Sequence, residues 1–348
     1  MKSGSNLEKV LEAGHFAVTA ELGPPMSADG DEVKEKMEIL RGSADAYNIT
    51  DNQTAVVRLS SIASAIMLTQ GGMEPVMQMT TRDRNRIAIQ ADMLGAAAFG
   101  IKNCLCIAGD HQAFSAAGKL KGHVGARNVY DIDSIQLVAV LKKMRDEGLT
   151  EGGDPLEPAP KMLIGAAWTP MGDPVEFRIM RLAKKAAAGA GFIQTQGIYD
   201  IEQFREIMKK VRKLGLHEKT AILGGVIVPK SGMMLKYMNS SVAGVSVPKA
   251  LVGRMNDVRK AAGDWKKAEA AGDEKGVKAI KKQARLNQAA EGKKIAIELC
   301  EQLRETEGVR GVHIQAIEWE RAVPGIVEAA GLLPRPEMPA DEAEAAAP

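Results

Sequence analysis

Short apolar runs rich in β-forming residues alternate with longer helical patterns along this chain, and this alternation constrains the fold more than any other feature. Near-continuous apolar runs are typical of parallel strands that are covered on both faces. The candidate strands are Ala17–Leu22, Ala46–Thr50, Pro75–Thr81, Asn103–Gly109, Met162–Trp168, Phe192–Gln196, Ala221–Val228 and Gly311–Ile317. The helical patterns between them are Asp31–Arg41, Ser60–Thr69, Asp83–Phe99, Asp133–Asp146, Pro174–Ala188 and Ile201–Leu214.

Strand-then-helix units repeated in this way favour a closed (β/α)8 TIM barrel, an α/β fold. An open, doubly wound sheet is the alternative. No GxGxxG motif follows the first apolar run, which weakens a dinucleotide-binding version of that open sheet. A chain of 348 residues is long enough for one barrel with additional helices.

Three segments interrupt the alternation. Leu149–Pro160 is a loop rich in Gly, Pro and acidic residues, and Val252–Glu305 is a long Lys/Ala-rich helical stretch that breaks near Gly272. Pro334–Pro348 is an acidic, low-complexity tail that we expect to be disordered. We therefore expect one barrel domain over residues 1–333, with extra helices at about 252–305 between strands seven and eight, and a tail at 334–348.

The helical insertion has many lysines and few large apolar residues to fill a core. We expect it to form helices outside the barrel wall and to be a candidate docking surface. A solvated basic face is the simplest interpretation of its lysines, and binding of RNA or of an acidic partner is the alternative.

The overall composition excludes several function classes. The formal net charge of +2 argues against nucleic acid as the main ligand. Cys104 and Cys106 do not have the spacing of a CxxC redox pair, and no Cys/His cluster has zinc spacing, so no metal site is expected. The segment MKSGSNLEKVLEAG lacks the apolar core of a signal peptide, and no apolar run reaches membrane-spanning length. We expect a soluble, cytoplasmic protein without a membrane segment.

Polar residues that end the apolar runs are the candidate site residues, because chemistry in a barrel gathers where the strands end. Glu21 closes the run FAVTAE. Apolar neighbours disfavour the charged form of a carboxyl group, so we expect the pKa of Glu21 to be raised, which suits an acid at neutral pH. A surface glutamate at a strand end is the alternative.

The other strand ends carry similar polar groups. Thr50 ends strand two, and the segment from Thr80 to Arg86 ends strand three, where Asp83 is a candidate N-cap and the arginines are candidate phosphate contacts. Asp110 follows strand four in a Gly-Asp turn. Gln194 and Gln196 face one side if strand six is regular, where they suit either the amide edge of a heterocycle or a hydrogen bond in the core.

Taken together, these strand ends resemble the methylenetetrahydrofolate reductase family, from about His15 to Leu333. The resemblance is carried by segments in barrel order: FAVTAELGPP, YNITDN, MQMTTRDRNR, NCLCIAGD, GFIQTQGIYD, GGVIVP and GVRGVHIQAIEW. It implies a flavin-dependent reductase of one-carbon metabolism that converts 5,10-methylenetetrahydrofolate to 5-methyltetrahydrofolate.

The resemblance also implies roles for individual residues. Glu21 is the acid that assists opening of the five-membered ring at the folate N10. Asp110 faces the pterin and stabilises the cationic iminium intermediate, and Gln196 hydrogen-bonds the pterin edge. Trp319 stands where the family has an arginine and is a further candidate substrate contact. Protonation of the leaving amine creates the electrophile that accepts hydride.

The cofactor implied by the family is FAD, with FMN as the alternative and NADH or NADPH as the candidate electron donor. Gln78 stands where many members have a histidine, and the helix after strand five has basic residues where the best-known members have others. The candidate cofactor contacts are Thr50, Gln78, Thr80, Arg82, Gly109, Asp110, Trp168, Arg181, Lys184 and Lys185.

Two other functions remain open. The chain is alternatively a flavin-carrying subunit of a larger electron-transfer complex, which receives electrons from a partner protein rather than directly from NAD(P)H. A barrel without flavin, such as a phosphate-binding aldolase, is a third interpretation. We expect a homo- or hetero-oligomer in which a partner subunit is a candidate source of electrons.

Overall fold

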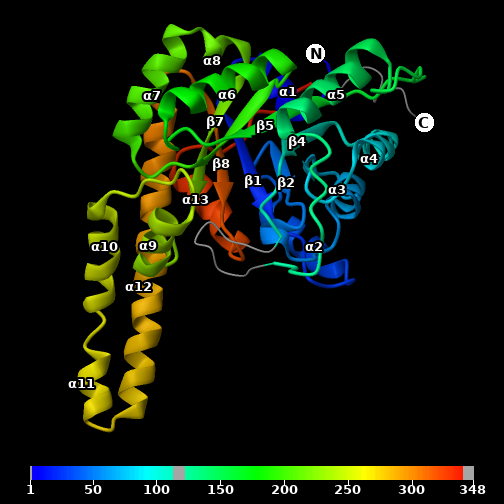
Figure 1. The fold of residues 1–348 in the computed structure, drawn as a ribbon. Helices are drawn as coiled ribbons and strands as arrows, with labels where there is room; N and C mark the ends of the chain where they lie inside the picture. Colours follow the sequence, from blue (N-terminus) through cyan, green and yellow to red (C-terminus); the bar gives the residue numbers. More distant parts are fainter. Residues whose placement is uncertain (1, 113–121, 340–348) are drawn as a thin grey trace.

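The computed structural model describes residues 2–112 and 122–339, and these form a closed barrel surrounded by helices (Figure 1). The strands pair in parallel in chain order, and β8 closes the barrel against β1. The strands are β1 (Ala17–Leu22), β2 (Ala46–Ile49), β3 (Pro75–Thr80), β4 (Asn103–Ile107), β5 (Leu163–Trp168), β6 (Phe192–Gly197), β7 (Ala221–Ile227) and β8 (Val309–Gln315). The predicted (β/α)8 barrel is therefore confirmed.

Most of the helices follow a strand and cover the outside of the barrel, whereas α1 precedes β1 and α10 to α12 extend away from it. They are α1 (Asn6–Glu12), α2 (Asp31–Leu40), α3 (Ser61–Gln70), α4 (Arg86–Ala98), α5 (Ser134–Glu147), α6 (Val175–Ala188), α7 (Ile201–Lys213), α8 (Leu216–Lys219), α9 (Gly232–Ser241), α10 (Lys249–Lys260), α11 (Trp265–Ala270), α12 (Glu274–Arg304) and α13 (Val323–Ala329), with short 3-10 turns η1 (Gln53–Ala55) and η2 (Glu320–Ala322). None of these helices combines the length and the apolar character needed to cross a membrane.

The prediction that Asp83 is the N-cap of α4 is wrong. The helix begins at Arg86, and its cap is Asn85, whose side chain accepts a hydrogen bond from the backbone N–H of Ala88. Asp83 instead accepts hydrogen bonds from the guanidinium of Arg82. An aspartate that pairs with a neighbouring cation is no longer available to a helix end.

The inside of the barrel changes from apolar to polar along the strands, because alternate residues of each strand face inward. The first inward layer forms a hydrophobic cluster that contains Ala17, Val76 and Phe192. Two residues further along each strand stand the buried polar side chains of Thr19, Gln78 and Gln194. The carboxyl ends of the strands therefore supply polar groups, whereas the amino ends supply packing.

The amino-terminal end of the barrel is closed by α1. Leu7, Val10 and Leu11 of this helix belong to the same cluster as the first inward layer. Part of the predicted disordered tail is also ordered here, since Arg335 donates hydrogen bonds to the carboxylate of Asp45 and to the carbonyl of Phe16. Residues 340–348 lie outside the described residues.

Helices α10, α11 and α12 form an arm that extends away from the barrel (Figure 1). Asp264 and Asp273 cap the starts of α11 and α12, which places the break where the glycine at 272 predicted it. The second half of α12 is anchored, with Ile295 and Leu299 in the main hydrophobic core, whereas its first turns have no buried residue before Ala284. The arm is thus fixed at one end and exposed at the other.

Candidate functional site

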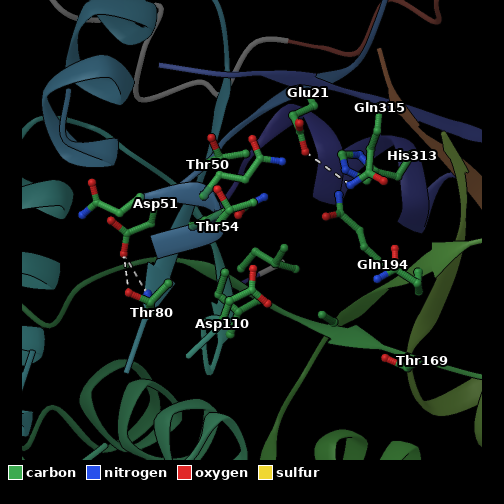
Figure 2. Close-up of a pocket in the computed structure, with 18 of the residues that line it drawn as sticks. Glu21, Thr50, Asp51, Thr54, Thr80, Asp110, Thr169, Gln194, His313 and Gln315 are labelled. Atoms are coloured by element: carbon green, nitrogen blue, oxygen red, sulfur yellow. Dashed lines mark hydrogen bonds between the residues drawn. The ribbon is translucent and has the colours of Figure 1, made fainter. Parts of the chain in front are cut away.

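A cavity of about 390 Å³ opens at the carboxyl ends of the strands (Figure 2). This volume lies within the range of small-molecule sites. The residues that line it come mainly from the inward positions and the following loops of β1 to β6 and β8. Those predicted from the sequence are Glu21, Thr50, Gln78, Thr80, Arg82, Gly109, Asp110, Trp168, Gln194 and Gln196. The closure of the barrel brings these separate segments to one place.

Glu21 is the penultimate residue of β1, which lies beside β8, and is only 5% exposed. Its Oε2 accepts one hydrogen bond, from Nε2 of Gln315 at 3.3 Å (Figure 2). Burial raises the pKa of Glu21 to about 7, with a further increase from the charge of Glu320. The raised pKa expected from the sequence is therefore found, and the carboxyl group can carry a proton near neutral pH.

Below Glu21 lies a buried polar network, in which the core hydrogen bond that the sequence offered as one interpretation of Gln194 is found, whereas Asn48, Thr19 and His313 were not predicted. Asn48 and Gln194 donate hydrogen bonds to each other at 2.7 and 3.0 Å, and Gln194 also donates to the hydroxyl of Thr19. That hydroxyl lies 3.0 Å from Nδ1 of His313. Burial lowers the pKa of His313 to about 3, so the imidazole is neutral. The floor of the cavity is thus polar but uncharged.

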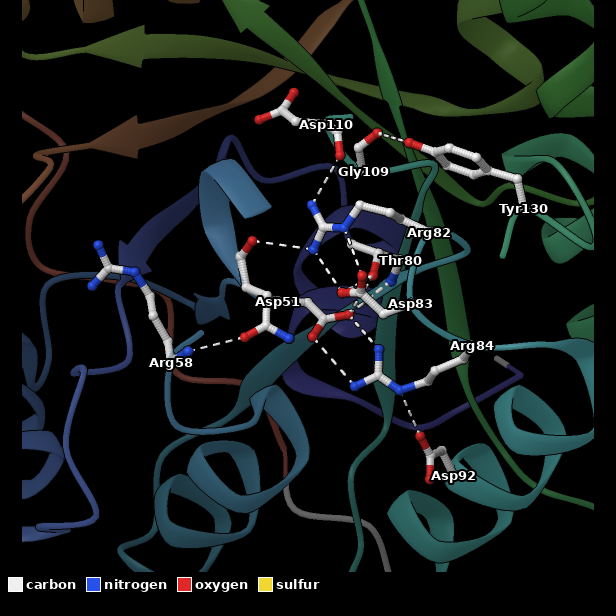
Figure 3. Close-up of polar contacts among 11 residues, drawn as sticks. Asp51, Arg58, Thr80, Arg82, Asp83, Arg84, Asp92, Gly109, Asp110 and Tyr130 are labelled. Carbon is white, nitrogen blue, oxygen red and sulfur yellow. Dashed lines mark hydrogen bonds and ion pairs between the residues drawn. The ribbon is translucent and has the colours of Figure 1, made fainter. Parts of the chain in front are cut away.

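Arg82, the buried arginine that follows β3, forms hydrogen bonds with the loops after β2 and β4 (Figure 3). Arg82 donates to both carboxylate oxygens of Asp83, to the carbonyl of Asn52 and to the carbonyl of Asp110. Arg84 likewise binds the buried carboxylate of Asp51 at 2.7 Å. Four donor contacts of Arg82 are therefore made within the protein, and the guanidinium positions the Asp110 turn at the rim.

Two further polar groups lie at the cavity, on β3 and at the end of β2. The hydroxyl of Thr50 is buried and has no hydrogen-bond partner among the described residues. Such orphaned groups are rare in native proteins and call for a bound partner. Gln78, on the neighbouring strand, is also buried and lines the cavity. Together these groups suit the polar edge of a heterocycle.

Four of the predicted site residues lie outside this cavity. Arg181, Lys184 and Lys185 belong to α6, and none of them lines it. Lys185 is buried, donates to the carbonyl of Ala167, and has a pKa lowered to about 8 by burial and by the charge of Arg181. Trp319 lines a separate hollow with Glu35 on the outer surface.

These positions test how well a flavin fits. The ring system finds suitable partners in Thr50 and Gln78, because an unpaired hydroxyl and an amide can meet its polar edge. For the phosphates the fit is poorer, because Arg82 and Lys185 are engaged within the protein, and Arg181 and Lys184, the other predicted contacts, lie on α6 outside the cavity. Within residues 2–112 and 122–339, no cluster of His, Cys, Asp or Glu could hold a metal ion.

The comparisons with known proteins agree with this architecture. The family described as methylenetetrahydrofolate reductase matches residues 6–286. An uncharacterized protein from Clostridium thermocellum that binds two copies of 5-methyl-5,6,7,8-tetrahydrofolic acid has a similar fold, with a TM-score of 0.57, 13% identity, and coverage of 94% of this chain and 100% of its own. EDTA monooxygenase from Chelativorans sp. BNC1 scores 0.48 at 12% identity, over 92% and 95% of the two chains. No curated protein matches in sequence.

Proposed function

Since this chain belongs to the methylenetetrahydrofolate reductase family, we propose that it reduces 5,10-methylenetetrahydrofolate to 5-methyltetrahydrofolate with a bound flavin. The observation that carries the proposal is Glu21, a buried carboxyl group with a pKa of about 7 at the edge of a polar cavity. The folate ligand of the Clostridium thermocellum protein, whose fold is similar, supports a folate substrate.

Glu21 is the proton donor in this proposal. Its protonated carboxyl gives a proton to N10 of the substrate, the C–N bond to N10 breaks, and a cationic iminium carbon remains at N5. Asp110 stands on the exposed rim of the same cavity, where a carboxylate favours that cation. Gln196 also lines the cavity, and we assign to it a hydrogen bond with the pterin edge.

The flavin, FAD or FMN, supplies the hydride that the iminium carbon accepts. Thr50 and Gln78 would hold its ring, and Arg181 and Lys184 on α6, which lie outside the cavity, are the proposed phosphate contacts. NADH or NADPH is the proposed source of electrons. Arg82 acts indirectly, because its hydrogen bond to the carbonyl of Asp110 fixes the turn that carries this carboxylate.

Substitution of Glu21 tests the proposal directly. Glu21→Gln keeps the size of the side chain but cannot give a proton, so its folate reduction should fall about 100- to 10,000-fold. Reduction of the flavin by its donor or by dithionite requires no proton from Glu21 and should be unchanged. Stopped-flow flavin absorbance separates the two half-reactions. Folate reduction by Glu21→Gln at the rate of the unchanged protein would refute the assignment of the acid.

Two further variants serve as controls for this experiment. Asp110→Asn should weaken folate binding and slow its reduction together, because the effect of Asp110 is electrostatic. Glu74→Gln alters another glutamate of raised pKa, at the opposite end of the barrel, where it binds the start of α1. It should lower stability but leave the rate per folded molecule unchanged.

A second candidate function is that of a flavin-carrying subunit that receives electrons from a partner protein. The exposed arm favours this function, because a helical projection anchored only at its base offers a surface to another chain. Flavin reduction by NADH or NADPH alone would argue against this second function. Reduction that requires an added redox protein would support it.

A further inference from the structure

Glu21 borders two cavities. Besides the cavity at the barrel mouth, it lines a small one of about 20 Å³ together with Lys36, Arg58 and Glu320. This volume has room for about one water molecule, and its walls are polar. Nε of Arg58 is buried without a hydrogen-bond partner among the described residues. A water molecule in the small cavity would provide a partner for that donor.

Glu320 connects the small cavity with the surface. It begins η2, is 8% exposed, and its Oε1 lies 3.3 Å from Nζ of Lys36. Both residues also line a hollow of about 370 Å³, with the exposed Glu35 and Arg321 at its sides. One carboxylate thus borders both the surface hollow and the small cavity that Glu21 lines.

An acid that gives away its proton must regain one in each turnover. Bulk water reaches Glu21 poorly, since the side chain is buried, and a ligand in the barrel mouth covers that approach further. A supply of protons through the barrel wall is independent of whether the mouth is occupied.

We propose that Glu320 relays protons from the surface hollow through the small cavity to Glu21. This inference rests on the proposed role of Glu21 as the acid. The Glu320 carboxyl gives a proton to a water molecule in the small cavity, that water gives a proton to the Glu21 carboxylate, and Glu320 takes a new proton from solvent. No electrons move, and each donor is restored. Glu320 acts through Glu21 and does not touch the substrate.

The charged groups around the two carboxyls are consistent with such a relay. Glu21 is faced by the amides of Gln315 and Gln53, by Arg58 and by Glu320. Burial raises the pKa of Glu21, and the negative charge of Glu320 raises it further, whereas the two amides and Arg58 lower it. Lys36 faces Glu320 and also lies 3.7 Å from Glu32 on the same helix. The two carboxyls are therefore electrostatically linked.

The test compares the first turnover with later ones in Glu320→Gln, with excess methylenetetrahydrofolate and reduced viologen as the source of electrons. The assay is run at a pH well below the Glu21 pKa of about 7, so that Glu21 begins protonated in the variant as well and the first turnover should keep its normal rate. Later turnovers should be slower by about 10-fold or more, which gives a burst of one product per site. Glu35→Gln is the matched control, because Glu35 lines only the surface hollow and pairs with Arg321. It should show no burst.

A second variant keeps Glu320 and blocks the small cavity instead. Ala316 is buried and lines that cavity, so Ala316→Val should fill it and produce the same burst. Ala316→Val alone also tests the relay if Glu320→Gln does not fold. A readout without flavin is infrared titration of the Glu21 carboxyl. This group should ionise at lower pH in Glu320→Gln, whereas its pH of ionisation should be nearly unchanged in Ala316→Val.

Two outcomes would overturn the relay. The first is steady turnover by folded Glu320→Gln and Ala316→Val at the rate of Glu35→Gln. The second is a first turnover that is slowed as much as the later ones, which would indicate a structural role for Glu320. Failure of the proposed function looks different, because Glu21→Gln would then reduce folate normally. A Glu21→Gln variant that is inactive, beside a Glu320→Gln variant without a burst, would refute the relay alone.

Discussion

Each end of the barrel holds a glutamate whose pKa is raised mainly by burial, and the two differ in their partners. Glu74 at the amino-terminal end accepts hydrogen bonds from the backbone N–H groups of Asn6 and Leu7 and from the amide of Asn103. Glu21 at the other end is met only by side-chain amides, those of Gln315 at 3.3 Å and of Gln53, and by no backbone N–H group among the described residues. A carboxylate with several donors is fixed in place, whereas one with few partners is free to exchange its proton.

The surroundings of the two glutamates also differ, since those of Glu74 are apolar and closed and those of Glu21 are polar and open. Near Glu74 the barrel is filled by the apolar cluster and closed by α1. Near Glu21 the barrel opens into a polar cavity in which the hydroxyl of Thr50 has no hydrogen-bond partner within residues 2–112 and 122–339. The amino-terminal end of the barrel therefore contributes to stability. The carboxyl-terminal end keeps polar groups that a ligand can bind.

The largest effect on stability is expected at the packed end. The ring of Phe192 fills the space above Gly165, where an added Cβ would lie closer than 3.0 Å to the ring. Phe192→Ala should lower the free energy of unfolding by about 3–5 kcal/mol, because it leaves a cavity in the first inward layer. Urea unfolding followed by circular dichroism measures this. A loss below about 1 kcal/mol would mean that this layer is loosely packed.

The next effect is a pH dependence at the open end. Glu21 has a pKa of about 7 in the folded protein against an ordinary value of 4.5, so its ionisation opposes folding. The contribution of the protonated Glu21 side chain to the free energy of unfolding is fully present below pH 4.5. It is lost as the pH rises through 7, and the total loss is about 3 kcal/mol. Glu21→Gln should lack this loss, which urea unfolding at pH 5 and pH 8 would detect. Parallel pH profiles for the two proteins would contradict the raised pKa.

A smaller effect is expected at Thr50. Thr50→Val removes a buried hydroxyl that has no partner in the described part of the chain, so the ligand-free protein should change in stability by about 1 kcal/mol or less. Affinity for flavin should fall by about 10-fold if the hydroxyl binds the ring. Isothermal titration with FMN and FAD measures this, and Thr50→Ser, which keeps the hydroxyl, is the control. Equal affinity in Thr50→Val would remove Thr50 from the cofactor site.

The smallest effect concerns the arm. Lys266, Lys278 and Lys282 are exposed on α11 and the first part of α12. Changing all three to glutamine should alter the free energy of unfolding by about 0.5 kcal/mol or less and leave flavin content intact. Binding of a partner protein should weaken, as pull-down from cell extract at low and high salt would reveal. Loss of the fold would show that the arm is needed by the barrel.

The sequence predicted the barrel well because each buried strand carries its own local signal. Glu21 and Thr50 could be found in the same way, since each polar residue ends an apolar run. The network of Thr19 with His313 could not, because these residues are far apart in the chain and meet only when β8 closes against β1. A single buried histidine leaves no local pattern that distinguishes it from a core residue.

The arginine of the third strand end shows a different limit. The sequence placed Arg82 correctly near the cavity and suggested phosphate contacts. Its donors are instead engaged by Asp83 and by two loop carbonyls, and such carbonyl contacts depend on backbone geometry that residue types do not reveal. Basic residues near a strand end therefore indicate the location of a site better than their role in it.

The arm also changes how the protein behaves in solution. Helix α12 has 31 residues and is about 46 Å long, and its first part, which has no buried residue before Ala284, projects from the barrel. A compact chain of this size has a radius of gyration of about 20 Å. A globule with such a projection diffuses more slowly than a sphere of equal mass. On a sizing column the 37.2 kDa monomer should elute ahead of globular standards of its own mass, so early elution alone is no evidence for a dimer. Light scattering, which reports mass independently of shape, is the appropriate measure of its oligomeric state.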